Sequence, residues 1–332
     1  MALVRCPSNP VLQASDIPFD ASLIFNAGVC KFNGRYVMVF RNDVGFSPKG
    51  WDKVYTNLGI AYSDDGVRWE VQPTPWKVAE QIVAADPEIS RFYDPRLTVI
   101  DGRCYLCFAV DTRHGVRGGI AVTDDFENFE VLSMSAPDNR NMVLFPEKFA
   151  GKFVRLERPF PEYSRGYQEK FDIWSSMSPD CRYWGDTKLV LGLEDVPFCN
   201  AKIGPAAPPI KTSKGWLAIF HATYKDNNRA LLGWEVSMNP NRIWHKEYLA
   251  GLMLLDLENP QKVIGLAPEP LLRATEKYEL DGFRGSVIFP GGMILEDDGE
   301  VKIYYGAADT VECLATASVD DLLGMIKPFR RS

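Results

Sequence analysis

The segment Arg91-Phe92-Tyr93-Asp94-Pro95-Arg96 places one carboxylate among two arginines, an aromatic residue and a proline, directly before an apolar run. Pro95 fixes its own φ and disfavours the helical region for the residue before it, so we expect Asp94 to be extended at the start of a strand. Arg96 is two positions further on and is expected on the same face. A carboxylate held in this way can protonate a leaving group, bind a ligand, or form a turn with a nearby arginine.

Cationic and hydrogen-bonding residues stand at the ends of several expected strands. Arg140-Asn141 precedes one strand pair, Arg158 ends it, and His221 ends the next pair. Arginine offers a planar fork that suits phosphate oxygens, and a histidine beside it adds a further donor. Arg155 is expected to share the face of Arg158 and is an alternative phosphate ligand. Together these residues predict an anion site, while each one alone is equally typical of a surface salt bridge.

An acid combined with an anion site indicates glycosyl transfer. Inverting cleavage of a glycoside needs one acid for the leaving oxygen and a nucleophile on the opposite face of the sugar. A hydrolase needs a second carboxylate as base, for which Glu157 and Glu162 are weak candidates. A phosphorylase needs a cationic cradle instead, because phosphate is already a nucleophile, and Asp94 with the basic group fits that arrangement better. Tyr93 and Phe283 are the aromatic residues that we expect to stack on a sugar.

One hairpin pattern recurs five times along the chain: an apolar strand, a short turn containing Gly, and a longer strand rich in aromatic residues. The first two turns, Asn33-Gly34 and Asp101-Gly102, are the strongest kind of short hairpin signal. The expected hairpins occupy residues 29–41, 97–110, 147–158, 209–223 and 293–305. Short helices are expected at 76–85 and 320–325.

Further strands follow these hairpins. Residues 58–70 closely resemble residues 118–130, and residues 172–180 form a looser copy. Repeats of about four short strands are typical of propeller blades. We therefore predict an all-β fold, a five-bladed β-propeller that forms a single domain over residues 1–332, with a pair of β-sandwiches as the alternative.

The innermost strands of a propeller converge on a central channel, so residues at equivalent places in the repeats should meet there. The residues expected in this ring are Asn26, Arg41, Asp94, Arg140, Arg158, Lys202, His221, Asp281 and Asp309.

Composition excludes several classes of protein. A net charge of −7 argues against nucleic-acid binding, which needs a basic face. No apolar run is long enough for a membrane span or a signal peptide, and the seven scattered cysteines are typical of reduced thiols in a cytoplasmic protein. With only three histidines, we expect no metal site and no cofactor. The oligomeric state, including a homo-oligomer, stays open.

Six segments carry a resemblance to a known family. They are 26–29 (NAGV), 93–96 (YDPR), 144–148 (LFPEK), 202–204 (KIG) with 208–210 (PPI), 288–290 (IFP) and 304–310 (YYGAADT). These segments resemble glycoside hydrolase family 130, the β-mannoside phosphorylases and their relatives, whose fold is a five-bladed β-propeller.

The resemblance implies a role for each matching residue. Asp94 takes the place of the general acid, whose proton passes through a sugar hydroxyl. The positions that hold the mannosyl unit are Asn26, Arg41, Lys202 and Asp309, and substrate contacts are also expected from Tyr93 and Arg96. The phosphate positions are Arg140, Asn141, Arg158 and His221, a set that the hydrolytic branch lacks. Asp281 and Phe283 are expected beside the acceptor sugar.

From these observations we expect an intracellular inverting phosphorylase that acts on a β-mannoside and phosphate, the latter as co-substrate, and releases α-mannose 1-phosphate. The acceptor is expected to be glucose or mannose in β-1,4 linkage. The alternatives are a β-1,2-mannoside phosphorylase, an inverting β-mannosidase that uses water, and a non-catalytic sugar-binding propeller.

Overall fold

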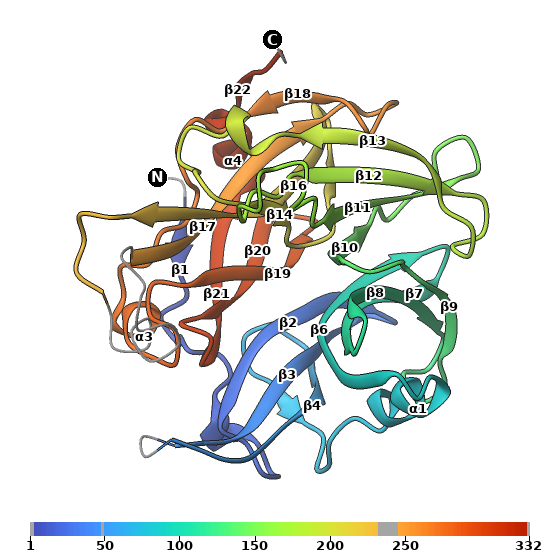
Figure 1. Ribbon diagram of the computed structural model, residues 1–332, viewed down its shortest axis with the longest axis vertical. Helices are drawn as coiled ribbons and strands as arrows, with labels where there is room; N and C mark the ends of the chain where they lie inside the picture. Colours follow the sequence, from blue (N-terminus) through green and yellow to red (C-terminus); the bar gives the residue numbers. More distant parts are fainter. Residues whose placement is uncertain (1–2, 48–49, 232–244, 331–332) are drawn as a thin grey trace.

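The structure, a computed structural model, describes residues 3–47, 50–231 and 245–330. Five antiparallel sheets are arranged around a common centre (Figure 1). The predicted five-bladed β-propeller is confirmed, and the alternative prediction, a pair of β-sandwiches, is wrong. No helix in these described ranges has the length and apolarity needed to cross a membrane.

Each blade is named here by its strands, from the innermost outwards. Blade 1 contains β2 (Leu23–Phe32), β3 (Arg35–Ser47), β4 (Gly50–Ser63) and β5 (Glu70–Val71). Blade 2 contains β6 (Ile89–Ile100), β7 (Arg103–Thr112), β8 (Gly115–Thr123) and β9 (Glu130–Met134). Blade 3 contains β10 (Asn139–Leu144), β11 (Phe153–Pro159), β12 (Ile173–Ser178) and β13 (Gly185–Leu191). Blade 4 contains β14 (Ile203–Pro205) with β15 (Ile210–Thr212), β16 (Gly215–Asp226), β17 (His245–Leu255), β18 (Val263–Leu266) and β22 (Lys327–Pro328). Blade 5 contains β19 (Ile288–Leu295), β20 (Glu300–Ala307), β21 (Val311–Ser318) and β1 (Val4–Arg5).

The two ends of the chain are tied into the last two blades. The N-terminal strand β1 pairs with β21, and the C-terminal strand β22 pairs with β18. Short α-helices outside the sheets, among the residues that the structure describes, are α1 (Val78–Ala85), α3 (Lys277–Leu280) and α4 (Val319–Met325). The helices expected near 76–85 and 320–325 are therefore confirmed.

Four of the five predicted hairpins form as expected, and the third differs. The turn at Ala150-Gly151 is present, but the inner strand β10 ends at Leu144, and residues 147–149 make only one bridge, between Phe149 and Lys152. Pro146 explains the break because it has no N–H to donate to the sheet.

The inner strands of blades 1, 2 and 3 share a bulge that decides where polar side chains point. Asn26, Asp94 and Asn141 have φ values of 56°, 52° and 59°, and the strand register shifts at each of them. The prediction that Pro95 holds Asp94 extended is wrong, and Asp94 lies within β6 rather than before it. Asn and Asp tolerate this left-handed backbone better than most residues, and a bulge re-aims the side chain that it carries.

Arg96 lies at the centre of the ring, where it binds backbone rather than an open site. Only 3% of it is exposed. Its guanidinium donates to four carbonyl oxygens, those of Pro95, Asn26, Ala206 and Pro290, which belong to blades 2, 1, 4 and 5. Arg96 thus joins the inner segments of four blades.

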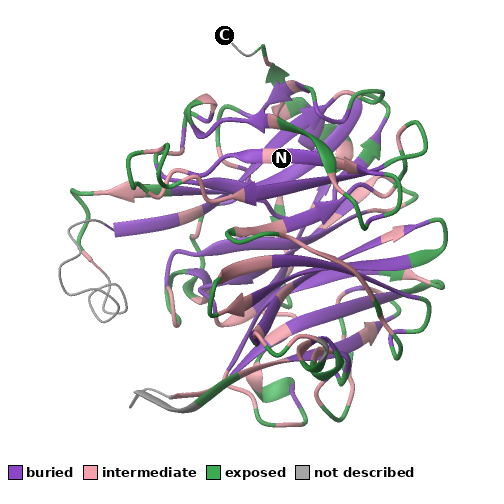
Figure 2. Ribbon diagram, turned by 45° about the vertical axis from the view of Figure 1, so that its right-hand side comes forward, coloured by how far each residue is buried: buried purple, intermediate pink, exposed green. Residues whose placement is uncertain are grey.

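The remaining core consists of apolar clusters between neighbouring blades (Figure 2). The cluster between blades 2 and 3, around Ile120, Leu144 and Phe153, has the fewest buried residues. Polar side chains also lie at that interface.

Replacing Arg96 should destabilise the fold strongly. Arg96→Met would leave four carbonyls without their donor, and hydrogen bonds to a charged group contribute about 1.5–3 kcal/mol each. We expect urea denaturation to show a free energy of unfolding lower by about 3 kcal/mol or more. The control is Arg103→Met, which removes an exposed pair with Asp124 and should change stability little. Equal effects of the two substitutions would contradict this role for Arg96.

Candidate active site

A central pocket receives side chains from all five blades. It encloses about 510 Å³ of empty space, part of which is open to solvent. Its lining residues are Asn26, Arg41, Asp94, Arg140, Asn141, Arg158, Lys202, Tyr248, Arg284, Val287, Phe289 and Asp309. Most of the ring predicted from the repeats therefore lies together.

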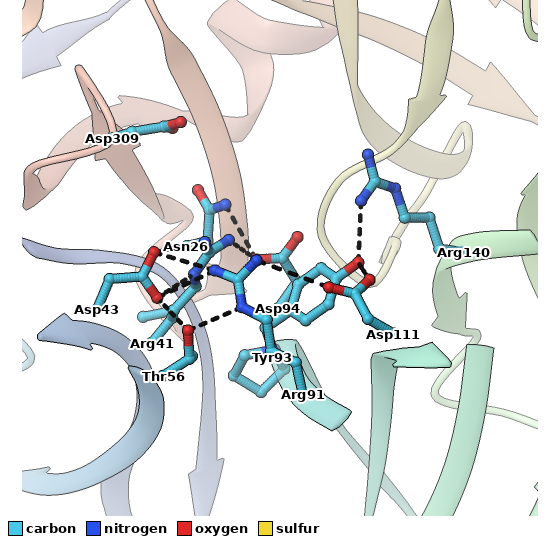
Figure 3. Close-up of polar contacts among 12 residues, drawn as sticks. Asn26, Arg41, Asp43, Thr56, Arg91, Tyr93, Asp94, Asp111, Arg140 and Asp309 are labelled. Atoms are coloured by element: carbon cyan, nitrogen blue, oxygen red, sulfur yellow. Dashed lines mark hydrogen bonds and ion pairs between the residues drawn. The ribbon is translucent and has the colours of Figure 1, made fainter. Parts of the chain in front are cut away.

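Asp94 is held on one wall of the pocket by two neighbours from blade 1 (Figure 3). The amide of Asn26 and the guanidinium of Arg41 donate to its Oδ1 over 3.1 and 3.3 Å. Arg41 also binds both carboxylate oxygens of Asp43, at 3.0 and 2.6 Å. Arg41 is thus fixed between two carboxylates, and Asp94 keeps its second oxygen for another partner.

The charges around Asp94 favour its ionised form. Burial raises the pKa of Asp94, but Arg41, Arg96 and Arg140 together outweigh burial and hold the pKa below its ordinary value. Asp94 is therefore deprotonated in the ligand-free protein near neutral pH. Donating a proton requires a partner that weakens these positive charges.

The wall on the blade 3 side of the pocket carries two arginines, the buried Arg158 and the half-buried Arg140. Arg140 and Arg158 are cross-strand neighbours on β10 and β11, and both guanidinium groups lie over the ring of Phe160, at 5.6 and 5.0 Å. Neither forms an ion pair with a described residue. Burial and the charge of Arg140 lower the pKa of Arg158 to about 9. Buried, unpaired charges of one sign are costly, so this wall is suited to an incoming anion.

His221 lies behind Arg158 and does not line the pocket. Arg158 donates to Nε2 of His221 over 2.8 Å, and the ring of Phe289 packs 4.6 Å away. Burial, followed by the charges of Arg158 and Lys202, keeps the pKa of His221 well below its ordinary value. The neutral ring accepts a hydrogen bond from Arg158 at Nε2 and carries its proton on Nδ1, which has no partner among the described residues. His221 thus holds Arg158 from outside the pocket lining, and its contact with phosphate stays a prediction.

Lys202 approaches the same wall from blade 4 and is tied to an acidic residue. Its ammonium group pairs with Glu169, which also pairs with Lys246 at 2.8 Å. Burial lowers the pKa of Lys202 to about 8. Burial alone would raise the pKa of Tyr248, but Lys202 and Lys246 lower it to about 7. This edge of the pocket therefore carries groups that exchange protons near neutral pH.

A second carboxylate, Asp309, lines the pocket from blade 5. Burial raises the pKa of Asp309, although Arg284, 3.2 Å away, and Arg41 oppose the shift. Asp309 also has a left-handed backbone, with φ of 48°. Its oxygens can hydrogen-bond to a sugar hydroxyl.

Several predicted site residues lie outside the pocket lining. Tyr93 is buried, accepts from Arg140 and donates to Asp111, and its ring faces Arg41 and Arg91, so it positions an arginine and does not offer its ring to a sugar. The guanidinium of Arg96 donates its hydrogen bonds to backbone carbonyls. Asp281 is exposed, and Phe283 packs against Phe46 of blade 1, 5.0 Å between ring centroids.

Arg155 does not share the face of Arg158. They are three positions apart, so along a strand their side chains point to opposite sides. Arg155 pairs with Glu157 at 2.9 Å, and both line a separate cleft between blades 2 and 3. Arg158, not Arg155, is thus the arginine of β11 that reaches the pocket. Glu157 and the exposed Glu162, the two weak candidates for a hydrolytic base, are not among the lining residues either.

Four lining residues were not predicted as ligands: Tyr248, Arg284, Val287 and Phe289. Arg284 and Phe289 belong to segments that the sequence already singled out, 281–284 and 288–290. Tyr248 gave no signal because β17 begins earlier than the apolar run around 252–255 suggests. No cluster of potential metal ligands occurs in the part of the chain that the structure describes.

Comparison with known proteins supports an enzyme of one class. The family model for glycoside hydrolase family 130, described as beta-1,4-mannooligosaccharide phosphorylase, matches residues 5–328. The chain therefore belongs to glycoside hydrolase family 130, and it is an enzyme of the phosphorylase type.

Individual relatives differ in the linkage named for them. A beta-1,4-mannooligosaccharide phosphorylase from Ruminococcus albus is 32% identical over 97% of this chain and 90% of its own length. A 1,2-beta-oligomannan phosphorylase from a Thermoanaerobacter species is 31% identical over 96% of this chain and 98% of its own. The solved structure of a beta-1,2-mannobiose phosphorylase from Listeria innocua, in complex with beta-1,2-mannobiose, has 25% identity and a TM-score of 0.79 over 98% of this chain and 99% of that one.

Removing the unpaired charge of Arg158 should stabilise the anion-free protein. Replacing a buried charge by an apolar side chain of similar volume is often stabilising by about 1–4 kcal/mol. We expect Arg158→Met to melt at a higher temperature than the wild type in chloride-free buffer, and to lose the stabilisation that inorganic phosphate gives the wild type. The control is Arg155→Met on the same strand, which should lower the melting temperature because Glu157 loses its partner. A lower melting temperature for Arg158→Met would contradict an unpaired, functional charge.

Proposed function

We propose that this enzyme is an inverting β-mannoside phosphorylase that cleaves a β-1,4-mannoside with inorganic phosphate and releases α-mannose 1-phosphate. The observation that carries the proposal is the wall formed on the blade 3 side of the pocket by the half-buried Arg140 and the buried Arg158, neither of which has a carboxylate partner among the described residues. A hydrolase has no use for such a wall, because water carries no charge to be held.

In this proposal the bonds change in one displacement. A phosphate oxygen held by Arg140, Asn141 and Arg158 attacks the anomeric carbon, and the bond from that carbon to the acceptor oxygen breaks. Asp94 supplies the proton that the acceptor oxygen gains, through a sugar hydroxyl as the family resemblance implies. Asn26, Arg41, Lys202 and Asp309 hold the mannosyl ring, and positioning and electrostatic stabilisation contribute most of the rate.

The fixed charges explain how phosphate would prepare the acid. Arg140 is one of the three arginines that keep the pKa of Asp94 low. A phosphate dianion beside Arg140 would offset that charge and raise the pKa of Asp94, so phosphate binding and protonation of the acid would be coupled.

The linkage is the finer part of the proposal. The family model and the relative from Ruminococcus albus carry β-1,4 names, whereas the other two relatives described above carry β-1,2 names. We favour β-1,4-mannosyl-glucose or β-1,4-manno-oligosaccharides as substrates because the family model covers nearly the whole chain. A β-1,2-mannoside phosphorylase is the second candidate.

The deciding experiment compares β-1,4-mannobiose, mannosyl-glucose and β-1,2-mannobiose, each with and without inorganic phosphate, with product identification. We expect cleavage of a β-1,4 substrate only with phosphate, and α-mannose 1-phosphate as product. Arg158→Ala should raise the KM for phosphate about 10- to 150-fold, the loss of a charge-assisted hydrogen bond of about 1.5–3 kcal/mol. Arg155→Ala is the matched control and should leave the KM for phosphate nearly unchanged. Equally fast cleavage in phosphate-free buffer would end the proposal.

Phosphate binding should take up more protons in the wild type than in Asp94→Asn. The pKa of Asp94 starts below its ordinary value and rises when phosphate binds, so the complex gains a proton that the free enzyme lacks. Calorimetry of phosphate binding in two buffers of different ionisation enthalpy measures this uptake, and ionisation of phosphate itself contributes equally to both proteins. Asp94→Asn should also lower turnover by about 10²–10⁴-fold. Equal proton uptake in both proteins would show that Asp94 is not coupled to phosphate.

A further inference from the structure

Buried polar atoms without a hydrogen-bond partner are rare in folded proteins, and each one calls for an explanation. In the described ranges of this chain most of the residues that carry such atoms gather in two places. One is the pocket with its surroundings, where such atoms occur on Asn26, Arg140, Asn141, Arg158, His221 and Arg284. The other is the space between blades 2 and 3, where they occur on Asn139, Arg155 and Trp174.

The second group lines a cleft of about 1,130 Å³, part of it open to solvent. We call it the blade 2–3 cleft; one side is formed by residues 133–139 and the other by residues of β11, β12 and 182–187. It lies where the apolar cluster between blades has the fewest buried residues. Alternation along β10 separates the cleft from the pocket, because Asn139 lines the cleft and Arg140 lines the pocket.

The charged residues that line the blade 2–3 cleft are balanced in number, with Arg155 and Arg182 against Asp138 and Glu157. Arg155 is nine-tenths buried and pairs with Glu157 at 2.9 Å. Glu157 also accepts hydrogen bonds from Asn139, over 2.6 Å, and from Ser176. An anion would meet Glu157 and a cation would meet Arg155, so the cleft favours a neutral ligand.

One hydrogen-bond acceptor, two donors and one aromatic ring in the cleft have no partner among the described residues. The side-chain oxygen of Asn139, Nε of Arg155 and the indole N–H of Trp174 have no partner among the described residues. Trp174 is half-buried, and its ring has no aromatic or cationic partner in the described chain, whereas Trp184 is covered on one face by Arg155 at 4.2 Å. Hydroxyl groups both donate and accept, and the C–H face of a sugar ring packs on an indole.

We infer that the blade 2–3 cleft is a second, non-catalytic binding site for a neutral carbohydrate, with one sugar ring placed against Trp174. Small side-chain adjustments would bring the unused groups of Asn139, Arg155 and Trp174 to its hydroxyls. The inference is independent of the reaction in the pocket, because the two sites use opposite faces of β10 and β11.

The test follows the indole N–H signals of the protein by NMR after ¹⁵N-tryptophan labelling, during titration with β-1,4-mannotriose in phosphate-free buffer. Trp174→Phe identifies the signal of Trp174. We expect a saturable shift for Trp174 and Trp184 with a Kd on the order of 1 mM, and none for Trp69. Trp69 is the matched control, since its indole N–H is also buried without a partner but lies outside the cleft.

Two variants decide whether a shift arises in the cleft. Trp174→Phe keeps an aromatic ring without the N–H and should weaken binding about 2- to 10-fold, as measured by the Trp184 signal. Asp309→Ala removes a side chain that is proposed to hold the mannosyl ring in the pocket, and it should leave the Trp174 shift and its Kd unchanged. The inference is overturned if Trp174 does not shift, if Trp69 shifts equally, or if Asp309→Ala abolishes the shift. Failure of phosphorolysis in the separate product assay would not affect this result.

Discussion

The guanidinium group of Arg96 is the contact on which the rest of the pocket depends. It binds carbonyl oxygens of Asn26, Pro95 and Pro290, each within or next to an irregular stretch of an inner strand. A regular strand would turn alternate side chains away from the centre, and the bulges at Asn26 and Asp94 re-aim them. Because bulged backbone loses ladder hydrogen bonds, a buried donor with several N–H groups is needed to hold it. The catalytic geometry thus depends on a residue that does not reach the pocket.

The second constraint is the unequal distribution of charge across the pocket. On the side of blade 1, Arg41 is matched by Asp43 and Asp94, so this half is close to neutral. On the side of blade 3, Arg140 and Arg158 have no carboxylate partner among the described residues and contact Tyr93, His221 and the rings of Phe160 and Phe171. Burying this excess positive charge lowers the stability of the ligand-free protein, and the rest of the fold must compensate for it. Under the proposed function, an anion that enters would restore the balance and raise the pKa of Asp94.

The sequence predicted the architecture well because turn chemistry and repetition are local properties. Asn33-Gly34 and Asp101-Gly102 specify their hairpins, and recurring segments specify the number of blades. Side-chain direction was predicted less well. Asp94 and Arg96 were predicted to share one face because side chains alternate along a regular strand, but the bulge between them interrupts that alternation. Tyr93 and His221 were predicted to contact the ligand, whereas the structure places both outside the pocket lining and in contact with arginines. Sequence shows that a residue lies near a site, but not which of two neighbouring side chains faces the pocket.

Blade 3 shows how one pair of strands can serve two sites. Along β11, Arg155 and Glu157 face the blade 2–3 cleft, while Arg158 reaches the pocket. On β10 the change occurs between Asn139 and Arg140, two consecutive residues. Alternation therefore sorts the polar residues of this blade by partner: the arginine on the cleft side has a carboxylate, and those on the pocket side have none. Arginine is therefore structural at position 155, where Glu157 pairs with it, and available for a ligand at position 158, where no carboxylate of the described chain does.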